Sequence, residues 1–188
     1  MAETVDTPTA ILASAAAILR EHTFDDISYP ALADAVGVSE RTVYRQFPTR
    51  SHLLECLADW IEQTEFSLPP FVTIPQFQAA VRERFLAFDA APAFAFVCAR
   101  ASAISPTGGA EPTFLTRAIE ALVQTTYPGL NARDVGRATA ALRYFASAQF
   151  WARMRTGFDM DAGEISDVFD RTVSQALAAL PEMSPAAG

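Results

Sequence analysis

The side chains best suited to chemistry lie in one short stretch, residues 39–50, which is rich in arginine, hydroxyl and amide groups. Val43 and Phe47 are four residues apart, so in a helix both would face inward and leave the polar groups on the free side. Arginine can donate two hydrogen bonds to the edge of guanine, and hydroxyl and amide groups can bind bases or phosphates of duplex DNA. The pattern therefore predicts a DNA-reading surface formed by Ser39, Glu40, Arg41, Thr42, Tyr44, Arg45, Gln46 and Arg50. Within this surface we expect Arg41 and Arg45 at bases or adjacent phosphates, and Arg50 at a phosphate.

The preceding residues predict the elements that would present this surface. Ser28 is a candidate N-cap, and Pro30 falls in the first turn of a helix, where its missing N–H costs nothing. Gly37 can end that helix because glycine adopts a positive φ without a steric penalty, and Ser39 can cap the next one. Two short helices joined by a tight turn form a helix-turn-helix, whose second helix enters the major groove of DNA.

This stretch resembles the DNA-binding signature of the TetR (tetracycline repressor) family, A-x-x-[AV]-G-V-S-x-x-T-x-Y-x-x-F-x-x-[KR]-x-x-L-L. The residues that match the signature are Ala33, Val36, Gly37, Val38, Ser39, Thr42, Tyr44, Phe47, Arg50, Leu53 and Leu54. The sequence departs from the family pattern at Val36, where alanine is usual, and at Thr23, which replaces the glycine that commonly ends the first helix. Its N-terminal tail also carries Glu3 and Asp6 instead of a basic arm.

The resemblance implies a DNA-binding domain at residues 1–50 and a ligand-binding and dimerisation domain at residues 51–188. We expect a transcriptional regulator, most simply a repressor that binds a palindromic operator in double-stranded DNA as a homodimer and is released by a small apolar molecule. The alternative is a helical ligand-binding or interaction module that no longer binds DNA. The formal net charge of −8 keeps this alternative open, because it opposes nonspecific binding to nucleic acid.

The rest of the chain predicts an all-α fold of about nine helices, with a three-helix N-terminal domain and a C-terminal bundle. Proline, glycine and capping residues divide it into helical segments, with no alternating strand pattern. The expected segments are a first helix capped by Thr7 or Thr9, a helix from Ser51 to before Leu68, Pro75–Phe88, Pro92–Ile104, Glu111–Thr126, a long helix from Asn131 to Arg155 ended by Gly157, and a last helix from Asp161 to Leu180. We expect a loop at residues 105–109 and a frayed tail at residues 181–188.

The last two predicted helices carry the longest apolar stripes outside the motif. The long helix would be apolar on more than half its circumference, so it must be covered on two sides. Its own bundle could cover both sides, or a partner chain could cover one, as the resemblance implies. The residues expected at a dimer interface are Leu142, Phe145, Val168, Phe169, Val173 and Leu177.

The central segments are rich in aromatic residues, most of which we expect in the core. The resemblance implies that some of them line a ligand cavity, with a few polar groups to orient the ligand. The residues assigned to this pocket are Phe66, Phe85, Phe88, Phe96, Arg100, Phe114, Tyr144, Gln149 and Trp151.

The sequence offers little support for an enzyme. His22 and His52 lie in the DNA-binding part, and the chain contains no E-x-x-H pair, Gly-rich phosphate loop or G-x-S-x-G motif. Cys56 and Cys98 are far apart, which favours two buried free thiols. The N-terminus is acidic and polar, unlike a secretory signal. We therefore expect no catalytic activity, no cofactor, no metal and no membrane association, and a cytoplasmic location.

Overall fold

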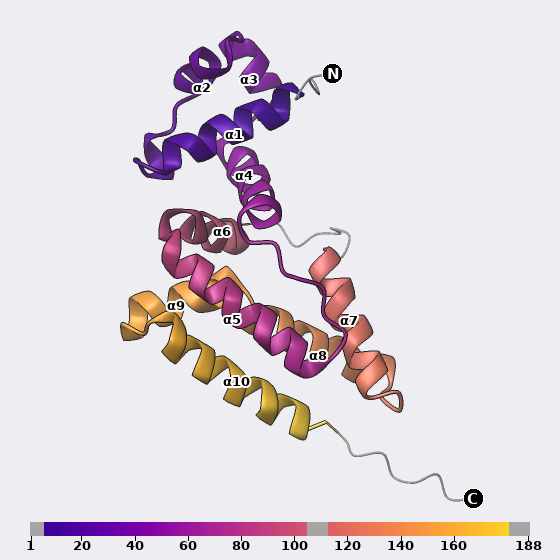
Figure 1. Cartoon of the computed structure of the whole chain (residues 1–188). Coiled ribbons are helices and arrows are strands. Elements are labelled where there is room, and N and C mark those ends of the chain that lie inside the picture. Colours follow the sequence, from indigo (N-terminus) through magenta and orange to yellow (C-terminus); the bar gives the residue numbers. More distant parts are fainter. Residues whose placement is uncertain (1–5, 105–112, 181–188) are drawn as a thin grey trace, which may run out of the picture. The chain divides into compact units, whose positions relative to one another are not determined.

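The computed structural model describes residues 6–104 and 113–180 (Figure 1). Within these ranges the chain forms ten α-helices and one short 3-10 helix, η1, without any strand, which confirms the all-α prediction. The elements in order are α1 (Thr7–Leu19), η1 (Phe24–Asp26), α2 (Tyr29–Val36), α3 (Glu40–Gln46), α4 (Arg50–Thr64), α5 (Ile74–Ala90), α6 (Pro92–Ile104), α7 (Phe114–Thr126), α8 (Ala132–Phe145), α9 (Ala148–Phe158) and α10 (Ala162–Ala178). The predicted loop at 105–109, the helix start at Glu111 and the tail at 181–188 lie outside the described residues.

None of the helices in the described ranges is by itself long and apolar enough to cross a membrane. Among the helices that the structure describes, only α5 and the first part of α6, taken together across a sharp bend, reach the length and apolar content of a span.

The chain divides into two compact units, each of which we describe separately. The first comprises Met1–Ser67 and Ala90–Pro106, and the second comprises Leu68–Asp89 and Thr107–Gly188. In the first unit α4 packs on α1 and α6, because Leu53, Leu57 and Ile61 are fully buried on its inner faces. The packed unit therefore continues past residue 50, where the sequence predicts a domain boundary. The division of functions at that boundary stays a prediction.

Local hydrogen bonds fix the helix starts of the first unit. Asp6, and not Thr7 or Thr9, caps α1, and its carboxylate accepts the N–H of Thr9 at 3.1 Å. Ser28 caps α2 as predicted, accepting the N–H of Ala31 at 3.3 Å. An N-cap side chain satisfies one of the four backbone N–H groups that begin a helix without a partner.

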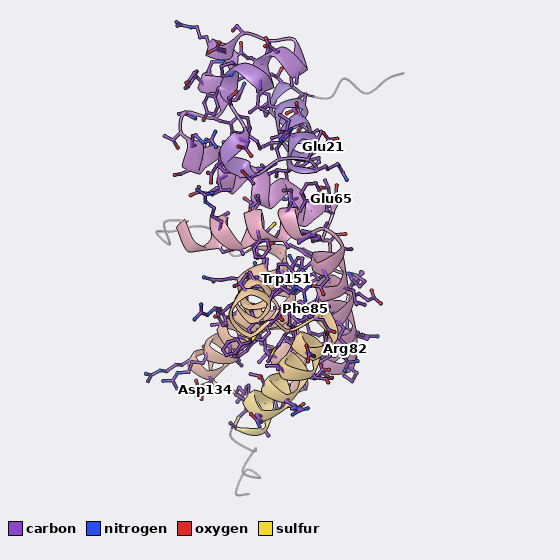
Figure 2. All side chains as sticks on the ribbon, turned by 90° about the vertical axis from the view of Figure 1, so that its left-hand side faces the viewer. Glu21, Glu65, Arg82, Phe85, Asp134 and Trp151 are labelled. Atoms are coloured by element: carbon purple, nitrogen blue, oxygen red, sulfur yellow. The ribbon has the colours of Figure 1, made fainter. Side chains whose placement is uncertain are left out.

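The core of the second unit is largely aromatic. Phe85, Phe88 and Trp151 are fully buried, and the rings of Phe88 and Trp151 lie 5.6 Å apart between centroids. Phe85 meets Phe169 of α10 edge to face at 5.7 Å. Figure 2 shows the side chains of Phe85 and Trp151 among the helices of this unit. Such rings bury large apolar areas and gain further from edge-to-face geometry.

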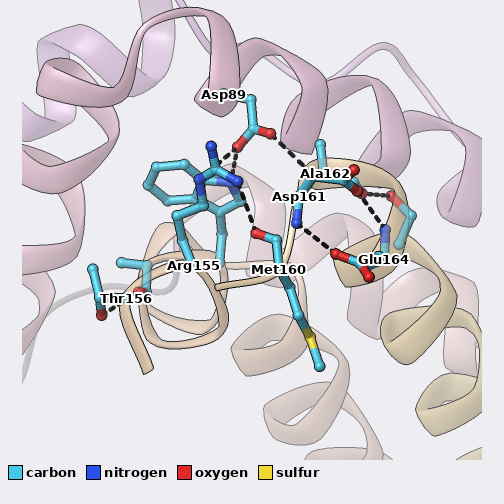
Figure 3. A network of polar contacts seen from close by, with 10 residues as sticks. Asp89, Arg155, Thr156, Met160, Asp161, Ala162 and Glu164 are labelled. Atoms are coloured by element: carbon cyan, nitrogen blue, oxygen red, sulfur yellow. Dashed lines mark hydrogen bonds and ion pairs between the residues drawn. The ribbon is translucent and has the colours of Figure 1, made fainter. Parts of the chain in front are cut away.

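Asp89, near the end of α5, joins three segments of the second unit (Figure 3). Its Oδ1 accepts the indole N–H of Trp151 at 2.8 Å, and its Oδ2 accepts the backbone N–H of Ala162 at 2.9 Å. The guanidinium of Arg155 lies 3.8 Å from the same carboxylate. Because Ala162 begins α10, a single side chain connects α5, α9 and the start of α10.

The predicted long helix from Asn131 to Arg155 is wrong, because the chain breaks between α8 and α9. Ser147 caps α9: its Oγ donates to the carbonyl of Tyr144 at 2.6 Å and accepts the N–H of Phe150 at 3.2 Å. The side chain thus replaces backbone partners on both sides of the break. Because residues 131–155 form two helices, the inference that one long helix must be covered on two sides does not apply.

The end of α9 also differs from the prediction. Gly157 lies within the helix, which continues to Phe158, and Asp159 takes the left-handed conformation with φ of 54°. Aspartate tolerates this region better than most residues other than glycine. Asp161 caps α10 as predicted, and Glu164 completes a capping box with it.

Candidate nucleic-acid interface

A tight turn sets the angle between α2 and α3. Gly37 adopts φ of 73°, and the N–H of Val38 reaches back to the carbonyl of Ala33 at 3.0 Å. Ser39 then caps α3 as predicted, accepting the N–H of Thr42 at 3.2 Å. This left-handed glycine at the helix end is the feature that lets the chain change direction between the two helices.

The two sides of α3 differ sharply in exposure. Val43 is fully buried and Phe47, directly after the helix, is 3 % exposed. Tyr44 is 53 % exposed on the other side. The side chains placed on this free side by the structure are those the sequence predicts: Ser39, Glu40, Arg41 and Arg45 are exposed, while Thr42 and Gln46 are half-buried.

The charges on α3 are available to a ligand. Arg41 and Arg45 make no ion pair with any other residue of the described ranges, and Glu40 is the one acidic residue on the helix. Glu40 lies in the first turn, where the helix dipole favours a negative charge. The free face is therefore locally cationic although the whole chain has a net charge of −8.

Tyr29 supports α3 from behind, a role that the sequence analysis did not assign. Its hydroxyl donates to the carbonyl of Phe47 at 2.7 Å, and its ring meets that of Tyr44 at 4.5 Å between centroids. Burial raises the pKa of the Tyr29 hydroxyl, because the charged form would lose its hydration. A tyrosine in the first turn of α2 carries no sequence signal for this role, since its partner lies 18 residues away.

Arg50, at the first position of α4, uses its guanidinium inside the first unit. Nη2 donates to the carbonyl of Phe24 at 2.7 Å, and Nη1 donates to the carbonyl of Ile27. The guanidinium carbon also lies 4.7 Å from the centroid of the Phe24 ring. These contacts fasten the start of α4 to η1. The predicted phosphate contact of Arg50 stays a prediction, and it would compete with or add to these bonds.

The residues predicted to line a ligand pocket are divided between the two units, and the pocket itself stays a prediction. Phe66, Phe96 and Arg100 belong to the first unit, and the other six belong to the second. Of those six, Phe85, Phe88 and Trp151 pack against other rings in the core, whereas Phe114 is 86 % exposed and Tyr144 is 47 % exposed; Gln149 is half-buried. Residue type predicted an apolar environment correctly for the buried rings, but it could not distinguish a core from a cavity.

Four of the six residues predicted at a dimer interface are buried within the single chain. They are Leu142, Phe169, Val173 and Leu177, with exposures between 0 % and 8 %. Their apolar stripes are covered by packing among α8, α9 and α10, and Phe169 also packs against Phe77 and Phe85 of α5. Only Phe145 and Val168 keep half-exposed side chains that a partner could cover.

Comparison with known proteins agrees with this geometry. Residues 11–57 match the model of the family described as bacterial regulatory proteins, tetR family. No protein of curated function matches the sequence. The fold is similar to that of a TetR transcriptional regulator from Rhodococcus sp. RHA1, with a TM-score of 0.67 and 14 % sequence identity over 94 % of this chain and 99 % of that chain.

The match at residues 11–57 covers α2, the turn and α3, which are the elements that present the cationic face. The likeness to the solved structure shows that the shared fold extends over the C-terminal helices as well. Residues 11–57 therefore carry the helix-turn-helix domain of the tetR family of bacterial regulatory proteins, the kind of domain with which regulators of transcription bind DNA.

Proposed function

We propose that the protein is a homodimeric repressor that binds a palindromic operator and is released by a small apolar molecule. The observation that carries the proposal is the free face of α3, where Arg41 and Arg45 are exposed and make no ion pair in the described part of the chain. Buried Val43 and Phe47 hold the opposite face against the unit. A short helix fixed in this way can enter the major groove with its polar side chains at base edges.

Each polar residue of α3 suits a distinct contact. Arg41 and Arg45 can bind guanine through O6 and N7 or an adjacent phosphate, and Glu40 can accept from the amino group of cytosine. Thr42 and Tyr44 suit the phosphate backbone, as do Ser39 and Gln46 at the ends of the helix. Since the protein acts on DNA, we place it in the cytoplasm.

The dimer is proposed from the operator geometry and from the half-exposed positions of α8 and α10. Two recognition helices that read successive major grooves on one face of DNA must lie roughly 34 Å apart, which a two-fold dimer achieves on an inverted repeat. Phe145 of α8 and Val168 of α10 are the predicted interface residues that are not already buried. Thr172 and Ala176 continue the half-exposed stripe of Val168 along α10 at intervals of four residues.

Selection of bound sequences from a random DNA library tests the central claim. The expected result is an enriched inverted repeat, with binding that weakens as salt rises because phosphate contacts release counterions. Arg41→Ala should relax preference at one base pair of each half-site, by about 1–3 kcal/mol. Arg82→Ala, which removes an arginine of the second unit, serves as a control and should leave the selected sequence unchanged.

The second candidate function is a helical ligand-binding or interaction module that has lost DNA binding. The net charge of −8 favours it, because most of the surface repels DNA. The same selection separates the two functions. Enrichment of a palindrome supports the repressor, whereas the absence of any enriched sequence at low salt would favour the module.

A further inference from the structure

A cavity of about 240 Å³ lies within the first unit, between the end of α1 with η1 on one side and α6 on the other. Ala93, Phe96, Val97 and Arg100 form its α6 wall, at the i, i+3, i+4, i+7 spacing of a single helix face. All of the lining residues belong to the same packed unit. This volume is large enough for a small organic molecule.

Most of the lining is apolar. Leu19 is 2 % exposed, Phe24 is 6 % exposed and Val97 is 4 % exposed, so these side chains form a floor that offers water few hydrogen bonds. Phe96 lines the same cavity and is 39 % exposed, so part of the wall reaches solvent. An apolar group that replaces water on such a floor is stabilised by the hydrophobic effect.

One strong cation borders this apolar floor. Nη1 of Arg100 donates to both carboxylate oxygens of Asp25, at 3.0 Å and 3.1 Å, and its guanidinium carbon lies 5.6 Å from the centroid of the Phe24 ring. A guanidinium has five N–H donors, and within the described residues these bonds engage only Nη1. The groups on Nε and Nη2 are therefore available to a second acceptor.

The surrounding charges favour an anion over a cation in this cavity. A second guanidinium, that of Arg50, lies over the Phe24 ring at 4.7 Å, and the imidazole of His22 is part of the lining. The nearby carboxylates already have partners: that of Asp25 is paired with Arg100, and that of Asp26 accepts the N–H and the hydroxyl of Thr23. A guanidinium binds carboxylate oxygens with short, charge-assisted hydrogen bonds. We propose that this cavity binds a small amphipathic carboxylate, with its apolar body on Leu19, Phe24 and Val97 and its carboxylate at Arg100.

The proposal can be tested without DNA, so it stands or falls independently of the repressor function. The full-length protein, labelled with ¹³C at leucine and valine methyl groups, is titrated with sodium benzoate and followed by NMR. Saturable shifts of the Leu19 and Val97 methyl signals support the site, whether or not signals from the second unit also move. If these two signals do not move at millimolar benzoate, or if only second-unit signals such as Val173 move, the proposal is overturned.

Variants separate the carboxylate contact from the apolar floor. Arg100→Gln should weaken benzoate binding by about tenfold or more, since a charge-assisted hydrogen bond is lost, and should leave binding of the neutral probe benzyl alcohol unchanged. Ala93→Leu fills the cavity and should weaken both probes. Arg82→Gln disrupts the comparable pair with Asp170 in the second unit and should affect neither. Arg100→Lys, which keeps the charge, should retain intermediate affinity for benzoate. Circular dichroism checks that each variant is folded. Equal benzoate affinity of Arg100→Gln and wild type would overturn the proposal.

Discussion

Arg50 illustrates how one side chain of the DNA-binding unit can have two roles. Its guanidinium donates to the carbonyls of Phe24 and Ile27 and covers the Phe24 ring. Arg50→Ala leaves both carbonyls without this partner, so we expect the free energy of unfolding to fall by about 1–2 kcal/mol in urea titrations. Arg45→Ala is the matched control, because Arg45 is exposed and should change stability very little. Wild-type stability of Arg50→Ala would show that these bonds contribute nothing.

The lysine variant distinguishes the structural role of Arg50 from its predicted phosphate contact. Arg50→Lys keeps the positive charge but cannot make the same two-pronged contact with two carbonyls. If Arg50 binds a phosphate, the lysine should restore DNA affinity without restoring stability, and the alanine should make the salt dependence shallower. If DNA affinity instead follows stability across both variants, Arg50 acts by positioning α4 and η1.

Tyr29 positions the recognition helix through its hydroxyl. Tyr29→Phe removes the donor to the Phe47 carbonyl and should lower the free energy of unfolding by about 1 kcal/mol near neutral pH. Tyr44→Phe is the control for stability, since the Tyr44 ring is 53 % exposed. If Tyr44→Phe lost this stability and Tyr29→Phe did not, the role assigned to the Tyr29 hydroxyl would be contradicted.

The same hydroxyl predicts a dependence on pH. Burial raises the pKa of Tyr29 above the ordinary value of 10.0, so the folded state holds the proton more tightly than the unfolded state. The stability that the hydroxyl contributes is therefore present below pH 10 and is lost as the pH rises through the raised pKa of the folded state. In urea titrations at increasing alkaline pH, the stability gap between wild type and Tyr29→Phe should narrow.

At the scale of elements, helix starts could be predicted where the hydrogen bond is local. Ser28, Ser39, Asn131 and Asp161 each accept an N–H three residues ahead, so type and position together determine the cap. The face of α3 could be predicted for the same reason, because the contrast between its apolar and polar residues is contained in one short segment. The choice of Asp6 over neighbouring threonines was not predicted, because adjacent residues offered equivalent oxygens.

Ser147 shows why the break between α8 and α9 could not be predicted. Apolar residues continue at helical spacing on both sides of it, so periodicity alone favours one long helix. Ser147→Ala removes the cap and the bond to Tyr144, and we expect it to cost about 0.5–2 kcal/mol in thermal or urea unfolding. As a control in the same region, Gly136→Ala should stabilise α8 by about 0.5–1 kcal/mol, since an added Cβ meets no atom within 4 Å. If Ser147→Ala left the free energy of unfolding unchanged, the break would not depend on this side chain.

The surroundings of the predicted pocket and interface residues were harder to predict, because periodicity identifies the apolar face of a helix but not the element that packs against that face. Phe85 and Trp151 are aromatic residues of the kind that line ligand sites, and in this structure they pack against other rings, so their role in a pocket stays a prediction. Leu142 and Val173 have the spacing of an oligomer seam and are covered by their own chain. Arg100 was assigned to a pocket in the C-terminal bundle but lines the cavity of the first unit.

At the scale of the whole molecule, the two units constrain how an effector could act. The chain passes between them after Ser67, before Ala90 and again after Pro106, and α4 packs with α6 in the first unit. A ligand that shifts the protein from 1:99 to 99:1 in favour of the released state must prefer that state by about 5.5 kcal/mol. Coupling is reciprocal, so operator DNA must lower effector affinity by the same factor. Equal affinity with and without operator would rule out release by that ligand.

The oligomeric state is the remaining property at this scale, and the burial of several predicted interface residues within the single chain changes how it should be tested. Leu177→Asp, although it lies in the predicted seam, would place a charge in the core, because Leu177 is 8 % exposed within the single chain. Val168 is half-exposed, so Val168→Asp can disturb a partner without disturbing the bundle. A buried charge without a counterion opposes association strongly, whereas the same charge in water does not.

We therefore expect Val168→Asp to be a folded monomer that binds single half-sites weakly, while the wild type sediments as a dimer and binds the inverted repeat. Loss of one half-site contact removes the gain from binding two linked sites at once, which can amount to a factor of about 10²–10⁴. Ser174→Asp, an equal charge at an exposed position of the same helix, should leave both dimer and affinity intact. Analytical ultracentrifugation at micromolar concentration, paired with DNA titrations, measures both quantities. A wild type that sediments as a monomer would refute the dimer, and a dimeric Val168→Asp would place the interface elsewhere than on the Val168 stripe of α10.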